Sequence, residues 1–242
     1  MTLKVHKRFL TTEQKWIHWL LKENGLKILR FNKKKFIYLI SPLKINESFN
    51  NDLVEVLKQK KVNFFQLRLK KENFTKKLEI AKKIKKICKK FNVKFLINDD
   101  VYLAKKLNAD GCHLGQKDMN ISKARKLIGN KIIGVTCHNS IALAKIAINN
   151  KASYLAFGAF NPSKTKKVKY KASIKLLKKA RKMTKTPIVA IGGINSSNYK
   201  KLLLNKANFL AISGYIWKNK KLKPKDAIKK LIWKLMQVKS EL

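Results

Sequence analysis

Short runs of apolar, β-branched or aromatic residues recur at fairly even intervals along the chain. Each run is continuous rather than alternating, which is typical of parallel strands whose outer face is covered by helices. Turn-forming and lysine-rich segments separate the runs. The pattern predicts eight strands, at residues 36–41, 62–67, 93–97, 111–114, 132–136, 154–160, 187–191 and 209–213.

Amphipathic segments of helical length lie between these runs, so that strand and helix alternate throughout. Eight similar units in about 200 residues favour an α/β fold of the (β/α)8 TIM-barrel type over an open doubly wound sheet. The clearest predicted helices are at residues 75–91, 139–150, 171–184 and 197–205.

Residues 11–30 predict an additional N-terminal helix with an apolar stripe that includes Trp16 and Trp19. An aromatic stripe at this spacing favours packing against the same domain over a separate interaction surface. We therefore expect an N-terminal extension over 1–34, mostly helical, followed by a barrel domain over 35–242.

The chain is strongly basic, with 58 Lys+Arg against 13 Asp+Glu and a formal net charge of +45. Such a balance raises nucleic acid or an acidic membrane as partners. The lysines are scattered through nearly every predicted helix, however, which indicates a solvated surface. A basic nucleic-acid-binding protein remains an alternative, motivated by this charge and by interleaved aromatics such as Phe64 and Phe95, although no recognition-module motif supports it.

Cys88, Cys112 and Cys137 are an odd number without CxxC spacing, so neither a disulfide framework nor a zinc site is indicated. The first ten residues lack the apolar core of a signal peptide, and no run reaches the roughly 18 apolar residues of a membrane span. We expect a soluble cytoplasmic protein without a membrane partner.

Gln66, Arg68 and Lys70 alternate at the end of the second predicted strand, in the segment QLRLK. A period of two turns all three side chains to one face, here the barrel interior or mouth. An amide with two cations suits a di-anion such as diphosphate, because Arg offers a bidentate fork and Lys a mobile point charge. The alternative is a buried ion pair with Asp99 or Asp110, but acids are scarce in this chain.

Acidic and amide side chains follow the next two predicted strands. Asn98, Asp99 and Asp100 end the third strand, and Asp118 follows the fourth. Asp99 and Asp118 could share one hard cation, because Mg2+ prefers one or two carboxylates plus substrate phosphates. Taken singly, each Asp is more typical of a turn or a helix cap.

Candidate phosphate contacts follow the later strands. Ser163, Thr165 and Lys166 lie in a loop after the sixth strand. The GG pair that includes Gly193 ends the seventh strand, and Ser213 ends the eighth, where many barrels hold a phosphate monoester. Two distinct phosphate sites are therefore predicted.

Thr136 and His138 end the fifth predicted strand, and a histidine there could shuttle a proton near neutral pH. A lone histidine is more often structural, so the role of His138 is left open. His113 lies inside the fourth strand and is interpreted as a hydrogen-bonded core residue, and Cys112 and Cys137 as small core hydrophobes.

Taken together, these segments resemble the thiamine phosphate synthase family. The matches span about 35–217 in the right order, and ADGCHLGQKD is the most specific of them. They are QLRLK at 66–70, INDD at 97–100, ADGCHLGQKD at 109–118, IGVTCH at 133–138, SKTK at 163–166 and AIGGI at 190–194.

The resemblance implies a transferase that condenses hydroxymethylpyrimidine diphosphate with a thiazole phosphate, with Mg2+ as cofactor, releasing pyrophosphate. It also implies a dissociative mechanism, in which pyrophosphate leaves before the thiazole nitrogen adds. The implied contacts with the pyrimidine diphosphate are Gln66, Arg68, Lys70, Asn98, Thr136 and Lys166. The implied Mg2+ ligands are Asp99 and Asp118, and the implied thiazole-phosphate contacts are Ser163, Thr165, Gly193, Ile212 and Ser213. The implied catalytic residues are Arg68, Lys70, Thr136 and Lys166.

The chain departs from the family pattern in two places. Leu69 replaces an acid, and Ala159, Asn161 and the Ser163-Lys164 pair alter the loop after the sixth strand. A related barrel, the thiazole tautomerase, is a second alternative, because it carries a histidine in the motif that contains His138. That enzyme needs no diphosphate clamp or metal pair, so the joint presence of the three cations and the two acids favours the synthase. These residues are Arg68, Lys70, Lys166, Asp99 and Asp118.

Overall fold

The protein is described here by a computed structural model that covers residues 36–162 and 168–236. One compact unit spans Lys35–Ile232, and Met1–Lys34 with Trp233–Leu242 form a second. The helix expected within 11–30 lies outside the described residues, as does the rest of the expected 1–34 extension.

Eight strands alternate with helices in chain order. The strands are β1 (Ile37–Ile40), β2 (Val62–Leu67), β3 (Lys94–Asn98), β4 (Gly111–Leu114), β5 (Ile132–His138), β6 (Tyr154–Gly158), β7 (Ile188–Ile191) and β8 (Phe209–Ile212). The helices are α2 (Phe49–Leu57), α3 (Phe74–Lys90), α4 (Val101–Lys106), α5 (Ile121–Ile128), α6 (Ile141–Asn149), α7 (Ile174–Met183), α8 (Lys200–Leu204), α9 (Gly214–Trp217) and α10 (Pro224–Met236).

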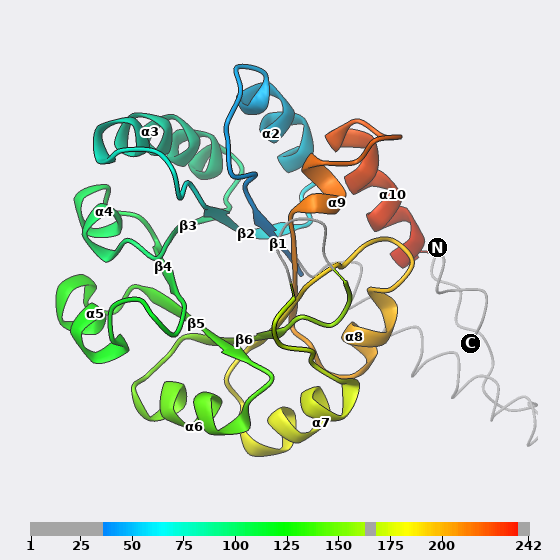
Figure 1. Ribbon diagram of the computed structural model, residues 1–242. Coiled ribbons are helices and arrows are strands. Elements are labelled where there is room, and N and C mark those ends of the chain that lie inside the picture. The colour runs from blue at the N-terminus through cyan, green and yellow to red at the C-terminus, as the bar shows by residue number, and fades with distance from the viewer. Residues whose placement is uncertain (1–35, 163–167, 237–242) are drawn as a thin grey trace, which may run out of the picture. The chain divides into compact units, whose positions relative to one another are not determined.

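The strands form one closed parallel barrel. Each strand pairs with the next in the chain, and β1 pairs with both β2 and β8. Figure 1 looks along the barrel, with helices α2 to α8 arranged around the strands. The predicted TIM barrel is therefore confirmed, and the open doubly wound sheet is excluded.

All eight predicted strands are present, but two ends differ by two residues. β5 continues past Thr136 to His138, because its pairing with β6 resumes after a register shift between these residues. β6 stops at Gly158 because the amide of Ala159 leaves the barrel ladder and donates to the carbonyl of Tyr170, at 2.9 Å.

The barrel interior is filled by side chains of unequal size. Gly134 on β5 leaves space for Tyr154 on β6, since a Cβ at Gly134 would lie 1.8 Å from Cζ of that ring. Two tyrosines are thereby fully buried at the centre of the barrel. The interior cluster consists of Tyr38, Ile40, Phe64, Leu96, Tyr154, Ala156, Val189 and Ala211.

Two arginines join loops at the amino ends of the strands. The Arg125 guanidinium donates to three carbonyl oxygens, those of Gly129 at 2.5 Å, Lys131 at 2.6 Å and Lys151 at 2.9 Å. Arg181 acts in the same way two strands further around the barrel, and it donates to Thr184 O, Thr186 O and Asn208 Oδ1. This end of the barrel is built for stability, as is usual for TIM barrels.

Candidate active site

The carboxyl ends of β2, β3 and β4 bring one cation and two acids together. The Lys70 ammonium, in the loop after β2, lies 3.1 Å from Oδ2 of Asp99, which directly follows β3. The Asp99 side chain is also hydrogen-bonded to Asp118, in the loop after β4. Asp118 accepts in turn from the amide of Gly115 at 2.6 Å. Three residues predicted from separate motifs therefore form one cluster.

The backbone at Asp99 is what directs its carboxylate to this cluster. Asp99 has φ 65°, a left-handed conformation that is uncommon outside glycine. Its amide donates to the carbonyl of His113 at 2.8 Å, which holds the turn after β3 against β4. The next residue, Asp100, is the N-cap of α4 and accepts from the amide of Leu103 at 2.9 Å. Of Asp99 and Asp100, only Asp99 is therefore free of a helix-capping role.

The two carboxylates of the cluster have pKa values displaced in opposite directions. Burial alone would raise the pKa of Asp99, but hydrogen bonds from Asp118 and Lys70 bring it below its ordinary value. The pKa of Asp118 is raised by burial, then by its hydrogen bond with Asp99 and the charge of that neighbour. Two acids this close repel each other when both are ionised, so the pair favours either a shared proton or a cation.

The same pair fits the chemistry of Mg2+. Across residues 36–162 and 168–236, no set of three or more His, Cys, Asp or Glu side chains is placed to hold a metal ion. Mg2+ does not need such a set, because it binds through one or two carboxylates and keeps waters and substrate phosphates as its other ligands. Asp99 and Asp118 supply hard oxygen donors of this kind.

Arg68 and Gln66 extend the site along the end of β2. The amide of Arg68 donates to the hydroxyl of Ser41 at 2.9 Å, which fixes the backbone beside β1. Partial burial lowers the pKa of the Arg68 guanidinium, and the charge of Asp99 opposes that shift. Leu69, which replaces an acid usual in the family, is buried. Gln66 is also buried and donates to Oδ1 of Asn98 at 2.7 Å.

Thr136 on β5 is connected to a buried histidine and two buried tyrosines. His113 contacts Oγ1 of Thr136 through Nε2 at 2.9 Å and the hydroxyl of Tyr154 through Nδ1 at 2.8 Å. The Tyr154 and Tyr38 hydroxyls are 2.7 Å apart. The interpretation of His113 as a hydrogen-bonded core residue is confirmed, although one of its partners is a predicted site residue. Cys112 and Cys137 are buried and unpaired, as expected.

The later strand ends place Gly193 and Ser213 at the same end of the barrel. The Ser213 hydroxyl donates to the carbonyl of Ser41 at 3.3 Å, so Ser41 contacts both Ser213 and the Arg68 backbone. Ile212 has a buried aliphatic side chain without donors or acceptors, so only its backbone could hydrogen-bond to a ligand. No direct bond between these residues and the Asp99 cluster is found in the described part of the chain.

The GG pair after β7 has a packing role beside any phosphate contact. Gly193 has φ 56°, and a Cβ there would lie 2.0 Å from the carbonyl oxygen of Pro162. The amide of Asn161 donates to the carbonyl of Gly192 at 3.2 Å. The start of the altered 159–164 loop therefore packs directly against these glycines. Ser163, Thr165 and Lys166, the other predicted residues of this loop, lie outside the described residues.

His138 contacts an aromatic residue just beyond that loop. Its ring stacks on Tyr170 with centroids 4.1 Å apart and planes 26° apart. The next residue, Asn139, donates to the carbonyl of Lys171 at 3.2 Å. The structure gives His138 a packing role between the end of β5 and the segment that leads into α7.

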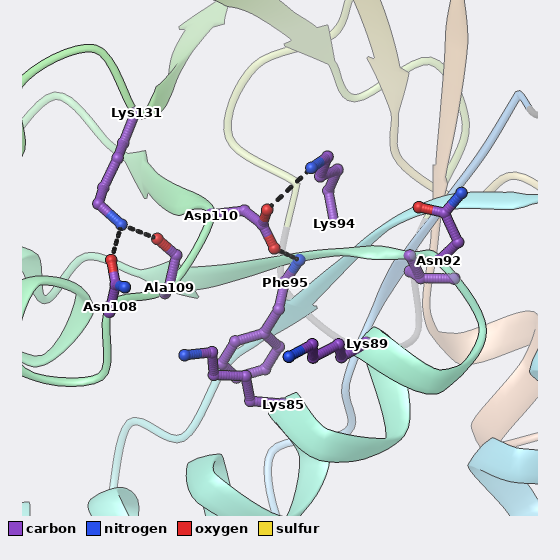
Figure 2. A pocket seen from close by; sticks show the side chains of 10 residues that line it. Lys85, Lys89, Asn92, Lys94, Phe95, Asn108, Ala109, Asp110 and Lys131 are labelled. Atoms are coloured by element: carbon purple, nitrogen blue, oxygen red, sulfur yellow. Dashed lines mark hydrogen bonds and ion pairs between the residues drawn. The ribbon is translucent and has the colours of Figure 1, made fainter.

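A cavity of about 450 Å3 lies at the other end of the strands. Figure 2 shows Asp110 between Lys94 and the amide of Phe95, and Lys131 beside Asn108 and Ala109. Lys85 donates to the carbonyl of Leu107 at 2.6 Å. Three of its lysines therefore have protein partners at the ends of helices or strands, and Asp110 is not part of the Lys70 cluster.

Sequence reasoning missed four residues that support the site. Tyr38 and Tyr154 lie in apolar runs that predict strands. The phenol inside each run is the signal that could have pointed to a buried hydrogen bond. Ser41 directly follows β1, in the same kind of position as the predicted site residues that follow their strands. Gln116 lies within the most specific motif, and its side-chain amide donates to the carbonyl of Thr136.

Comparison with known proteins shows which family the chain belongs to. Residues 37–216 match the family model described as thiamine monophosphate synthase. The chain belongs to this family. A thiamine-phosphate synthase of Pelagibacter ubique (strain HTCC1062) is 71% identical over 199 residues, covering 82% of this chain and 96% of the relative. One of Saccharophagus degradans is 45% identical over 160 residues, covering 66% of this chain and 74% of the relative.

A solved structure agrees with the sequence comparisons. The thiamine phosphate pyrophosphorylase from Pyrococcus furiosus superposes with a TM-score of 0.74 at 26% identity, covering 86% of this chain and 98% of that one. The family resemblance drawn from the motifs is thereby confirmed, and with it the assignment as a thiamine-phosphate synthase of the transferase class. Among the described residues, no helix is long and apolar enough to cross a membrane.

Proposed function

We propose that this family member condenses hydroxymethylpyrimidine diphosphate with a thiazole phosphate, with Mg2+ held by Asp99 and Asp118. The observation that carries the proposal is the contact of Lys70, Asp99 and Asp118 at the ends of three consecutive strands. A cation beside two oxygen donors is the arrangement that a metal-bound diphosphate requires.

The protein residues act mainly by charge. Lys70 and Arg68 lie where they neutralise the charge that builds on the departing pyrophosphate, and Lys166 is assigned the same task by its motif. Mg2+, when bound, would supply further positive charge to the diphosphate oxygens. Gln66 and Asn98 are assigned to the pyrimidine diphosphate by their motifs, and the hydrogen bond from Gln66 fixes the orientation of the Asn98 amide. The thiazole nitrogen attacks with its own lone pair, so no strong protein base is needed.

The thiazole phosphate is assigned to Gly193, Ser213 and the backbone of Ile212, with Ser163 and Thr165 from the same motif set. The positions of Gly193 and Ser213 after β7 and β8 support this, because barrels commonly bind a phosphate there. Ser41 would hold the two substrates in register, since it contacts both Arg68 and Ser213.

The test is the formation of thiamine phosphate by the purified chain from the two precursors. We expect product only with Mg2+, loss of product with EDTA, and recovery when Mg2+ is restored. Asp99→Asn and Asp118→Asn should each raise the Mg2+ concentration needed for half-maximal rate. Isomerisation of the thiazole carboxylate phosphate without condensation would instead show the tautomerase activity.

A further inference from the structure

A continuous chain of hydrogen bonds crosses the barrel interior and links three predicted substrate contacts, with Asn98 and Thr136 at its ends and Gln66 between them. Only its two end residues are partly exposed, and every residue between them is buried. The members come from six different strands. In order they are Asn98, Gln66, Tyr38, Tyr154, His113 and Thr136.

The first links give the chain a direction. Gln66 donates through Nε2 to Oδ1 of Asn98 at 2.7 Å, and its Oε1 accepts from the hydroxyl of Tyr38 at 3.3 Å. A phenol has one proton to donate. Because the Tyr38 proton is used by Gln66, Tyr154 must be the donor in the 2.7 Å contact between the two hydroxyls.

The remaining links follow by the same count. The Tyr154 proton is used by Tyr38, so the Tyr154 oxygen accepts from Nδ1 of His113. A neutral imidazole has one N–H and one acceptor nitrogen, and burial disfavours its charged form. Nε2 of His113 is therefore the acceptor, and the Thr136 hydroxyl donates its proton to it at 2.9 Å.

The direction decides what the two end residues offer to a ligand. The one hydroxyl proton of Thr136 points into the barrel, so its oxygen presents only lone pairs on the accessible side. Oδ1 of Asn98 is taken by Gln66, so its Nδ2 group presents N–H donors. The site thus combines an acceptor at β5 with a donor at β3.

The reverse direction is disfavoured by the acids beside Asn98. It would turn the Asn98 carbonyl oxygen outward, next to Asp99 and near Asp118. An oxygen there would also face the diphosphate of the proposed substrate, and a negative partial charge beside those anions is unfavourable. An anion at this position therefore selects the direction that the structure shows.

We propose that Tyr38, Tyr154 and His113 are positioning residues that commit Thr136 to accept a hydrogen bond from the amino group of the pyrimidine, while Asn98 donates to its diphosphate. This inference rests on the proposed function, and it adds a specificity that the motifs do not contain. A pyrimidine with a carbonyl in place of the amino group would meet the Thr136 lone pairs and be rejected.

The first test needs no substrate. Long-range 1H–15N spectra of the 15N-labelled full chain report which nitrogen of His113 is protonated, with the signals assigned by their loss in His113→Gln. The proposal predicts the Nδ1–H form in the free protein. A predominant Nε2–H form would overturn it.

The second test breaks the chain at its centre and measures substrate choice. Tyr154→Phe removes one hydroxyl and keeps the ring that packs beside Gly134. The kcat/KM ratio of the amino substrate to its 4-oxo analogue should fall by roughly tenfold, because the Thr136 proton is no longer held inward. The KM for the thiazole phosphate should stay unchanged, which a general structural defect would not allow.

Tyr199→Phe is the matched control, because Tyr199 is also buried and is not a member of the hydrogen-bond chain. If Tyr154→Phe fails to fold, Tyr38→Phe breaks the next link and should give the same fall in the ratio. An unchanged ratio in folded Tyr154→Phe or Tyr38→Phe, or an equal fall in Tyr199→Phe, would overturn the proposal. Absence of thiamine phosphate in the coupling assay would refute the proposed function while leaving the His113 spectrum to be judged separately.

Discussion

Lys70 and Lys71 are adjacent exposed lysines in the loop after β2, but only Lys70 has been found beside an acid of the site, 3.1 Å from Asp99. Lys70→Met should lower kcat/KM by roughly 10²- to 10³-fold, the usual loss for a preorganised charge-stabilising group. Steady-state kinetics with saturating Mg2+ measures this. Lys71→Met removes the same charge and should have little effect, so an equal loss in both variants would reduce the role of Lys70 to net charge.

His113 gives the stability of the fold a pH dependence. Burial lowers its pKa from an ordinary value of 6.5 to about 4. The unfolded chain therefore binds a proton between pH 6.5 and 4 that the folded chain does not, and stability is lost as the pH falls through this window. We expect the free energy of unfolding to drop by about 2 kcal/mol from this residue between pH 7 and pH 5.

Urea unfolding at the two pH values measures that drop. His113→Gln keeps a polar side chain that does not titrate, so its stability should depend less on pH by the same amount. If the two proteins show the same pH dependence, His113 is not neutral for the reason given.

At the residue scale, the sequence predicted the polar residues at the strand ends better than the buried residues that hydrogen-bond beneath them. The period of two in QLRLK and the acids after β3 and β4 predicted that Lys70, Asp99 and Asp118 face one another, and the structure brings these three together at strand ends. Tyr38 and Tyr154 were missed because their hydroxyls meet across 116 residues of sequence, and no local pattern reports such a pair.

Gly134 and Tyr154 form a size-matched pair between β5 and β6. Gly134→Ala would place Cβ 1.8 Å from Cζ of the Tyr154 ring, and the buried ring has no room to move. We expect a loss of about 3 kcal/mol in the free energy of unfolding from overpacking. Urea denaturation measures this loss, and a Gly134→Ala protein as stable as the parent would contradict the argument.

Arg125 tests whether geometry rather than charge joins the loops before β5 and β6. Arg125→Lys keeps the charge but cannot reach the carbonyls of Gly129, Lys131 and Lys151 at once. We expect destabilisation of about 1 kcal/mol, because charge-assisted hydrogen bonds to these carbonyls, one of them part-buried, are lost. The neighbouring exposed Lys126→Arg should be neutral in the same thermal or urea unfolding experiment. A neutral Arg125→Lys would show that the guanidinium fork is dispensable.

Strands were predictable as elements because each is a continuous apolar run, and their ends differ from the prediction by more than one residue only in β5 and β6. The shift after Thr136 and the exchange of partners at Ala159 depend on contacts with β6 and Tyr170. Closure of the sheet followed from the count of eight units, which is a property of the whole chain and not of any one run.

For the molecule as a whole, the charge of +45 predicts weak association with any polyanion. Binding to duplex DNA should be independent of sequence and should weaken by roughly 10³-fold between 50 and 200 mM salt. Fluorescence anisotropy with two unrelated duplexes measures both properties. A sequence preference that survives at 200 mM salt would revive the hypothesis of a nucleic-acid-binding protein as a second activity.

Arginine is rare in this chain, at positions 8, 30, 68, 125 and 181, although Lys and Arg together number 58. The three within the described residues are Arg68, a predicted diphosphate contact directly after β2, and Arg125 and Arg181, which hold two loop junctions. Lysine therefore carries almost all of the positive charge of the chain, whereas Arg125 and Arg181 each direct several N–H groups at separate acceptors. In a chain so rich in lysine, an arginine marks a position that depends on a planar, multidentate donor.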